Sequence, residues 1–482
     1  LVDGPMQHIG CSATLNPLEE IAAFLVGRSK DGNERPCTIL NAGIRKDLDI
    51  QVRAPLPDFL EASNTALWSS AYELLLEEIK SHDTTLVFAN SRYKAERTAL
   101  HLNESSSDGN VRIGAHHGSM SKDTRLKMED ALKTGQLDAL VATSSLELGI
   151  DIGSIDIVYQ LESPKSVAAG LQRVGRAGHL LDATSQGRVL VFERDELLEA
   201  GAIFSAMKSG DLDAVRIPGA CLDVLAQQIV GAVSTAPCQV DQLFDLVRQA
   251  YPYADLAREA FDAVIAMLAG ELPFEMTHPP IPLLLWDRVS GNLSPTRSAA
   301  NISFMCVGTI PDSTDYEVVI DSSNKRVGTV HSEFVDDNLR RGDVFVLGSS
   351  PWRVVGIRKN RLLVEQASAA TPTVPWWLGD VVSRTFEVGL GVGVLRRLIA
   401  ERLHDPKLPA LLRRDYYFDE HTAAAVIDYV REQQISAGMV PDERTLLVET
   451  WIDEMGRKNI IVHSPYGSRI NRTWGVAIAT HA

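Results

Sequence analysis

Four short polar segments in the first 180 residues carry side chains suited to binding or transferring a phosphate. In chain order they are residues 12–14 (SAT), 87–92 (VFANSR), 142–151 (ATSSLELGID) and 172–179 (QRVGRAGH). Hydroxyls and free backbone N–H groups bind phosphate oxygens, and a carboxylate such as Asp151 binds ribose hydroxyls. Arg176, which stands between Gly175 and Gly178, can neutralise charge that develops on a transferred phosphoryl group. Together, the segments indicate a site for a nucleotide or a nucleic-acid backbone.

Each segment taken alone also has a plainer explanation. A SAT tripeptide is a common polar turn, and a solitary basic turn such as that around Arg176 is most often a solvated helix end. Asn90 or Ser91 before a helix can simply cap its free N–H groups. Capping and phosphate binding are compatible, because a helix N-terminus is also a phosphate site.

The elements around these segments alternate between strands and helices. Buried apolar runs predict strands at 84–89, 111–115, 140–143, 155–160 and 188–192, and amphipathic spacing predicts helices at 93–102, 122–132 and from about 166. This alternation is typical of βαβ units and a parallel sheet that is covered on both faces. Ligands of such sheets bind beyond the carboxyl ends of the strands, which is where the polar segments fall.

Three further regions follow. Helical patterns at 222–233, 240–250 and 256–268, then a Pro-rich break at 278–282 and a strand at 283–289, fit a winged helix, with a plain three-helix bundle as the alternative. Short strands with many turns between 291 and 385 predict a small barrel or sandwich. From about 390 we expect helices near 394–403 and 421–434, strands near 445–451 and 459–463, and a last helix.

Composition limits the class of protein. The 482 residues carry a formal net charge of −16, with 45% hydrophobic and 23% charged residues, which excludes a disordered chain or a disulfide scaffold. The negative charge also disfavours a protein that coats nucleic acid by bulk positive charge. The five cysteines are scattered, and no signal peptide or membrane-length apolar run occurs. We therefore expect a cytoplasmic protein without a zinc site or a membrane contact.

The order and spacing of the four segments resemble motifs III, IV, V and VI of superfamily 2 helicases. Residues 116–119 (HHGS) are similar to the segment that grips the strand backbone between motifs IV and V in that family. Further strings resemble the large helicase-related (Lhr) family, and the match extends over essentially the whole chain. They include residues 194–200 (RDELLEA), 222–230 (LDVLAQQIV), 308–312 (GTIPD), 342–348 (GDVFVLG), 375–380 (PWWLGD) and 463–467 (HSPYG).

The Lhr resemblance implies an ATP-dependent 3′-to-5′ translocase on single-stranded DNA that unwinds DNA or RNA:DNA duplexes. The implied fold is α/β: a RecA-like parallel-sheet helicase domain, then a winged-helix domain and a β-barrel-containing α+β domain. The implied boundaries are residues 1–45 for the end of a first RecA-like domain and 46–210 for the second RecA-like domain. The winged helix then takes residues 211–290, and the fourth domain takes 291–482.

The resemblance also implies roles for single residues. Arg176 is similar to the arginine finger on ATP, with Gln172 and Arg173 in the same catalytic motif, and Gly149 and Asp151 are similar to the nucleotide contacts. Ser12 and Thr14 resemble the link between nucleotide state and strand binding. The implied nucleic-acid contacts are Asn90, Ser91, Arg92, His117, Gly118, Thr143, Ser144, and Trp376 or Trp377, one of which would stack on a base.

Three features depart from simple expectation. Motif VI ends in His179 where many superfamily 2 proteins have a second arginine, and residues 383–385 (SRT) keep Arg384 but lack an expected preceding glycine. Residues 389–393 (GLGVG) superficially suggest a dinucleotide loop. Their spacing does not fit G-x-G-x-x-G, and we interpret them as a turn that leads into a helix.

No G-x-x-x-x-G-K-[ST] loop and no DEAH or DExD box occurs in the sequence. In P-loop NTPases these elements hold the phosphates and Mg²⁺. We therefore expect a fragment of a longer product that is inactive as an ATPase by itself, with ATP and Mg²⁺ held mainly by the missing half. The alternatives are a non-catalytic nucleic-acid-binding or regulatory module, and a helicase whose natural strand is RNA.

Overall fold

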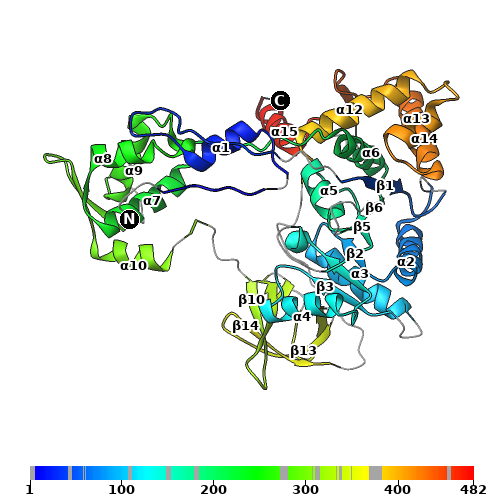
Figure 1. Cartoon of the computed structure of the whole chain (residues 1–482), viewed down its shortest axis with the longest axis horizontal. Coiled ribbons are helices and arrows are strands. Elements are labelled where there is room, and N and C mark those ends of the chain that lie inside the picture. The colour runs from blue at the N-terminus through cyan, green and yellow to red at the C-terminus, as the bar shows by residue number, and fades with distance from the viewer. Residues whose placement is uncertain are drawn as a thin grey trace. The chain divides into compact units, whose positions relative to one another are not determined.

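The structure is a computed structural model that divides into two compact units, residues 1–43 with 214–313 and residues 44–213 with 314–482 (Figure 1). Each unit is described by itself. The described residues run from 6 to 481 and leave out 13, 42–45, 58, 60, 107–110, 148–152, 179–183, 272–280, 307, 310–314, 333, 336–338, 349, 368–382 and 453–457.

A six-stranded parallel sheet forms the centre of the second unit. In spatial order it consists of β1 (Leu48–Arg53), β6 (Ser185–Leu190), β5 (Ile157–Leu161), β2 (Thr85–Phe88), β4 (Ala139–Ala142) and β3 (Ile113–His116). Every pair of neighbours is parallel, which confirms the predicted α/β sheet. Sequence analysis missed β1, because its LDIQVR pattern alternates polar and apolar residues at a sheet edge instead of forming an apolar run.

Helices cover both faces of this sheet. They are α2 (Asn64–Ser81), α3 (Arg92–Ser105), α4 (Lys122–Lys133), α5 (Val167–Val174) and α6 (Arg194–Ser209). The first four follow a serine whose hydroxyl accepts a backbone N–H three residues further on: Ser63, Ser91, Ser121 and Ser166. Such caps satisfy N–H groups that have no partner inside the helix, and so they fix where each helix begins after its loop.

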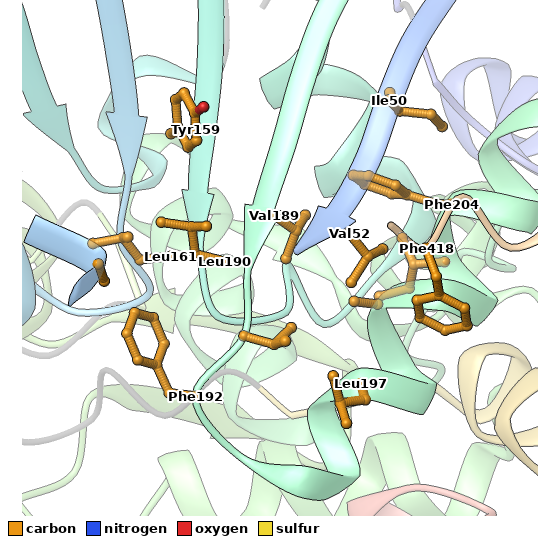
Figure 2. Close-up of a cluster of buried hydrophobic side chains, with 14 of the residues drawn as sticks. Ile50, Val52, Tyr159, Leu161, Val189, Leu190, Phe192, Leu197, Phe204 and Phe418 are labelled. Carbon is orange, nitrogen blue, oxygen red and sulfur yellow. The ribbon is translucent and has the colours of Figure 1, made fainter. Parts of the chain in front are cut away.

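The C-terminal helices share the core of the parallel sheet. They are α12 (Phe386–Glu401), α13 (Leu408–Asp415) and α14 (Glu420–Ala437). Figure 2 shows Phe418 beside Val52 of β1 and Phe204 of α6, and all three are buried in one cluster. The backbone of Val52 also pairs with this segment, accepting from Asp419 at 3.2 Å and donating to Tyr417 at 2.8 Å. Residues from about 386 to 440 are thus built into the helicase-type domain and do not stand apart in a fourth domain.

A curved five-stranded sheet lies in the same unit. Its order is β11 (Arg326–His331), β10 (Asp315–Ile320), β14 (Arg361–Gln366), β13 (Ser350–Arg358) and β12 (Val344–Leu347). Phe334, Phe345 and Val354 belong to its own small core, as expected for the predicted barrel region. The chain continues after α14 with the hairpin β15 (Leu447–Ile452) and β16 (Lys458–His463) and with α15 (Ser468–His481).

The first unit contains the predicted winged helix. Its elements are α7 (Leu222–Thr235), β7 (Cys238–Gln239), α8 (Val240–Val247), η2 (Tyr251–Tyr253), α9 (Arg258–Leu268), β8 (Leu284–Asp287), β9 (Asn292–Pro295) and α10 (Arg297–Met305). The strands pair in the order β7-β9-β8. The boundary predicted at residue 290 cuts the β8–β9 hairpin, and Ala299 of α10 is buried in the same core. The winged-helix core therefore includes α10.

Helix α1 (Leu18–Val26) belongs to this first unit. Phe24 meets Tyr251 of η2 edge-on at 6.5 Å, and Arg28 donates its backbone N–H to Gln249 at 2.7 Å. The assignment of residues 1–45 to the end of a first RecA-like domain stays a prediction. No helix in the described part of the chain combines the length and apolar character that a membrane crossing requires.

The glycines at 389, 391 and 393 lie inside α12, which begins at Phe386 after the Thr385 cap. The interpretation of this string as a turn was therefore wrong. A Cβ on Gly389 would lie 1.9 Å from the carbonyl oxygen of Pro465, and one on Gly393 would lie 2.5 Å from the backbone nitrogen of Glu443. These glycines let two backbone segments approach the helix more closely than any side chain permits.

We predict that Gly389→Ala and Gly393→Ala each lower the free energy of unfolding by about 1–3 kcal/mol, because backbone atoms must move to admit the methyl group. Gly475→Ala is the matched control in α15, where nothing lies within 4 Å of the added carbon. It should be neutral or stabilising by up to about 1 kcal/mol. Urea unfolding of the three variants measures this, and equal effects at all three positions would refute the packing explanation.

Candidate nucleic-acid and nucleotide site

Three of the predicted segments meet at the carboxyl edge of the parallel sheet. Strand β4 lies between β2 and β3, and its last residue, Ala142, is in register with Phe88 on one side and His116 on the other. Asn90, Thr143 and the 117–118 pair follow directly after these strand ends. The strand order therefore brings motifs IV and V together with the HHGS segment, as the sequence predicts for a parallel sheet.

The buried guanidinium of Arg173 connects motifs IV and V with the end of β5. The side chain is 4% exposed and comes from the last turn of α5. Its Nη1 donates to Asn90 Oδ1 at 3.0 Å and to Gln160 Oε1 at 2.7 Å, and its Nε donates to Glu147 at 2.6 Å. The guanidinium also lies over the Phe88 ring, 5.4 Å from its centroid. With these partners, Arg173 positions the motifs instead of facing a ligand.

The side chains of motif IV are mostly occupied within the protein. Asn90 donates to the Ser163 carbonyl at 2.7 Å in addition to accepting from Arg173. Ser91 caps α3, because its hydroxyl accepts the backbone N–H of Lys94. Its hydroxyl therefore lies at the N-terminus of a helix. Arg92 donates to Ser119 Oγ at 2.7 Å and so ties motif IV to the HHGS segment.

His117 is fully buried, with its Nε2 2.8 Å from a carboxylate oxygen of Glu96. Glu96 also accepts the backbone N–H of Gly348, from the loop between β12 and β13, at 2.5 Å. A buried ring cannot contact a nucleic-acid strand, so the structure does not support the direct contact predicted for His117. The ring instead positions the HHGS segment through its bond to Glu96. Gly118 beside it is exposed, with nothing within 4 Å of its missing Cβ, and its backbone is open to a ligand.

The curved sheet also forms backbone hydrogen bonds with residues 119–121, which follow Gly118. Thr329 of β11 donates its N–H to the Ser119 carbonyl at 2.6 Å, and Ser121 donates to the Val327 carbonyl at 2.8 Å. A Cβ on Gly328 would lie 2.4 Å from the Ser119 carbonyl oxygen, so this approach requires glycine. Backbone hydrogen bonds to β11 thus hold the segment after Gly118.

In motif V, Ser144 is exposed, whereas Ser145 points inward. The Ser145 hydroxyl lies 2.8 Å from His116 Nδ1, and His116 Nε2 lies 3.0 Å from Glu129. Burial lowers the pKa of His116, which favours the neutral imidazole near pH 7. Thr143 donates its backbone N–H to the His116 carbonyl at 3.1 Å, which joins the β3 and β4 ends. The outward groups are therefore the Ser144 hydroxyl and the Gly118 backbone.

Arg176 lies just beyond the end of α5 and is half-buried. Its Nη2 donates to the Glu147 carbonyl, so Glu147 contacts both arginines of motif VI, through its carboxylate and through its backbone. Burial lowers the pKa of Arg176, but an arginine keeps its charge near pH 7. Gln172 lies one residue before Arg173 on α5. A partly accessible cation within motif VI fits the predicted contact with a phosphate.

Several predicted residues are placed elsewhere or lie outside the description. Ser12 and Thr14 belong to the first unit, where Ser12 is exposed. Gly149, Asp151, His179, Trp376 and Trp377 lie outside the described residues. Arg384 forms ion pairs with Asp195 at 3.2 Å and Glu199 at 3.3 Å, so it secures the start of α12 to α6. Among the described residues, no group of His, Cys, Asp and Glu is arranged to hold a metal ion.

The parallel sheet with motifs IV to VI at its edge defines the C-terminal domain of a helicase, and the helicase conserved C-terminal domain matches residues 69–180. The winged helix domain of large helicase-related protein matches residues 205–374, and a DEAD/H-associated domain matches 440–482. The chain belongs to the large helicase-related (Lhr) family.

Relatives support this assignment over nearly the full chain. The Lhr helicase/probable uracil glycosylase of Mycolicibacterium smegmatis is 36% identical over 99% of this chain and 33% of its own length. The ATP-dependent helicase Lhr-Core of Methanocaldococcus jannaschii is 37% identical over 98% of this chain and 54% of its own. The chain thus spans between a third and about half of these relatives.

A solved structure agrees with this assignment. The structure of Mycobacterium smegmatis helicase Lhr bound to ssDNA and AMP-PNP matches with a TM-score of 0.73 at 35% identity. The match covers 95% of this chain and 54% of that one.

We predict that Arg173→Gln lowers the free energy of unfolding by about 3–5 kcal/mol, because it leaves the Glu147 carboxylate without its charged partner in a buried site. Arg414→Gln is the matched control, since Arg414 also forms an ion pair but its side chain is 75% exposed. That change should cost less than about 1 kcal/mol. Urea unfolding followed by circular dichroism gives both values. A similar small loss in both variants would show that Arg173 does not organise the site.

Proposed function

We propose that this chain is part of an ATP-dependent helicase that translocates 3′-to-5′ on single-stranded DNA and unwinds DNA or RNA:DNA duplexes. The observation that carries the proposal is the edge of the parallel sheet, where Gly118 and Ser144 are exposed beside motifs IV and V, which Arg173 holds together. An exposed backbone and a hydroxyl suit phosphodiester contacts that ignore base sequence, as a moving protein requires. The relative bound to ssDNA and AMP-PNP supports this class of ligands.

We assign the nucleotide side of the site to Arg176 and Gln172, with Gly149 and Asp151 as further contacts carried over from the family resemblance. Bound ATP with Mg²⁺ would supply the free energy of phosphoryl transfer. Arg176 is the partly accessible cation of motif VI, so it is suited to neutralising charge on the transferred group. The Mg²⁺ ion, like cytoplasmic localisation, stays a prediction from the sequence and the resemblance.

The contacts also suggest how nucleotide state could reach the DNA strand. Arg176 bonds to the backbone of Glu147, and the carboxylate of Glu147 bonds to Arg173. Arg173 in turn holds Asn90 of motif IV at 3.0 Å. A movement of Arg176 toward a phosphate would therefore act on motif IV through two side chains. This contiguous chain of polar contacts is the physical basis we propose for coupling.

We predict that Arg176→Ala, introduced into the longer product of which we propose this chain is a part, reduces DNA-stimulated ATPase activity by about a thousandfold. DNA affinity without nucleotide should stay near that of the parent, because Arg176 is not among the proposed strand contacts. Arg414→Ala removes an exposed arginine on α13 and serves as the control.

ATPase activity at the parent level in the Arg176→Ala variant would reject the assignment. Stimulation by single-stranded RNA in place of DNA, measured in the same assay, tests the alternative that RNA is the tracked strand.

A further inference from the structure

A groove between α2 and α3 lies outside the site described above. It contains two cavities of about 490 and 570 Å³, which share Asn64, Trp68, Tyr72 and Arg97 and so form one depression. None of the motif residues assigned to strand or nucleotide binding lines either cavity. Both cavities lie entirely within the second unit.

The groove has an aromatic wall. Trp68 stacks on Phe192 with ring centroids 3.9 Å apart and an angle of 11° between the planes. Tyr72 lies 5.6 Å from Trp68 at a tilt of 39°, and Tyr93 lines the same cavity. Trp68 is only half-buried and lines both cavities, so part of its ring is open to the groove. A partly covered indole of this kind is a stacking platform for a planar group.

One positive charge in the groove has no ionic partner. Lys94 pairs with Glu162, and Arg194 pairs with Glu432 at 3.1 Å. Arg97 lines both cavities and donates to the Tyr93 hydroxyl at 3.4 Å, with no ion pair within the described part of the chain. A half-buried guanidinium without a carboxylate is suited to binding a single negative charge.

Two buried hydroxyls lie beneath the groove beside Arg97. Thr98 is 1% exposed and Tyr72 is 9% exposed, and the oxygen atoms of both hydroxyls are closed off from solvent. Burial raises the pKa of the Tyr72 hydroxyl, and this effect is larger than that of Arg97 and Thr98, which lie near enough to lower that pKa. The Tyr72 phenol therefore stays neutral near pH 7 and adds no negative charge to the groove.

The groove begins next to the predicted strand contacts. Helix α3 starts directly after Ser91, and Lys94 and Arg97 lie one and two turns into it. Arg97 is therefore about 9 Å along the helix from Ser91. Glu162, which follows β5 at the carboxyl edge of the sheet, also lines the groove. A strand that passes motif IV would reach the groove without leaving the domain surface.

We propose that this groove binds an unpaired nucleotide of the single strand, with its base on Trp68 and its phosphodiester on Arg97. The proposal rests on the proposed function, since it extends the path of the same strand. One unpaired cation matches the single charge of a phosphodiester. A free nucleoside triphosphate would place several negative charges beside the carboxylates of Glu162 and Glu193.

The test measures binding of the 482-residue chain to a fluorescein-labelled oligothymidylate of about 20 nucleotides by anisotropy. Arg97→Gln should weaken binding about tenfold and reduce the slope of log K against log salt by about 0.7, the value for one phosphate contact. Trp68→Ala should weaken binding about tenfold, whereas Trp68→Phe should keep most of the affinity, because it keeps a stacking ring.

Lys127→Gln is the matched control, because it removes one exposed positive charge from α4, which does not line the groove. It should leave the affinity unchanged. Thermal unfolding of each variant shows whether the fold is kept. Should a variant unfold, photocrosslinking of the unaltered chain with an iodouracil-substituted oligonucleotide decides the matter, with crosslinks expected at Trp68 or Tyr93.

The outcomes separate this proposal from the proposed function. If the unaltered chain does not bind the oligonucleotide, the groove proposal is overturned, whereas the proposed function is tested separately by the ATPase of the longer product. If it binds and the folded Arg97→Gln and Trp68→Ala variants keep its affinity and salt slope, only the groove proposal is overturned. Crosslinks confined to other segments would likewise overturn the proposal that the groove binds a nucleotide. A protein segment would then be the better candidate for a ligand of the groove.

Discussion

The buried guanidinium of Arg173 is the interaction on which the candidate site depends. A charge that is 4% exposed must be paired and hydrogen-bonded, and here its partners come from three separate segments. Asn90 follows β2, Gln160 lies near the end of β5, and Glu147 lies in motif V. Because one planar group satisfies all three, the strand ends keep a fixed relation to each other. Ser144 belongs to motif V with Glu147, and the segment with Gly118 is joined to motif IV by the hydrogen bond from Arg92 to Ser119.

A second constraint comes from contacts between the curved sheet and the segment that carries Gly118. The Ser119 carbonyl accepts from β11, and Glu96 joins His117 to the loop after β12, so the curved sheet holds the segment that carries Gly118. On the other side of the parallel sheet, α12 to α14 share its core. Parts of the chain that are distant in sequence therefore act as one support for the carboxyl edge. We infer that this explains why the helicase-type domain and the C-terminal helices occur together.

Much of the site was predictable because its residues follow strands in a regular βαβ pattern. The strand positions, the Ser91 cap and the meeting of motifs IV and V needed only local sequence and the geometry of a parallel sheet. The burial of His117 was not predictable, because its partner Glu96 and the Gly348 that donates to Glu96 are distant in the chain. Gln160 gave no signal as a partner of Arg173. The glycines of α12 were misinterpreted for the same reason, since their neighbours are backbone atoms near 443 and 465.

Hydrogen–deuterium exchange of the chain with and without a single-stranded oligonucleotide tests the central claim most directly, because it reports on each backbone segment of the sheet edge. If this edge binds the strand, we expect slower exchange at residues 90–92, 117–119 and 143–147 when the oligonucleotide is bound, with the amino ends of the same strands unchanged. Protection confined to the winged helix, with no change at these three segments, would contradict the claim that this edge carries the strand.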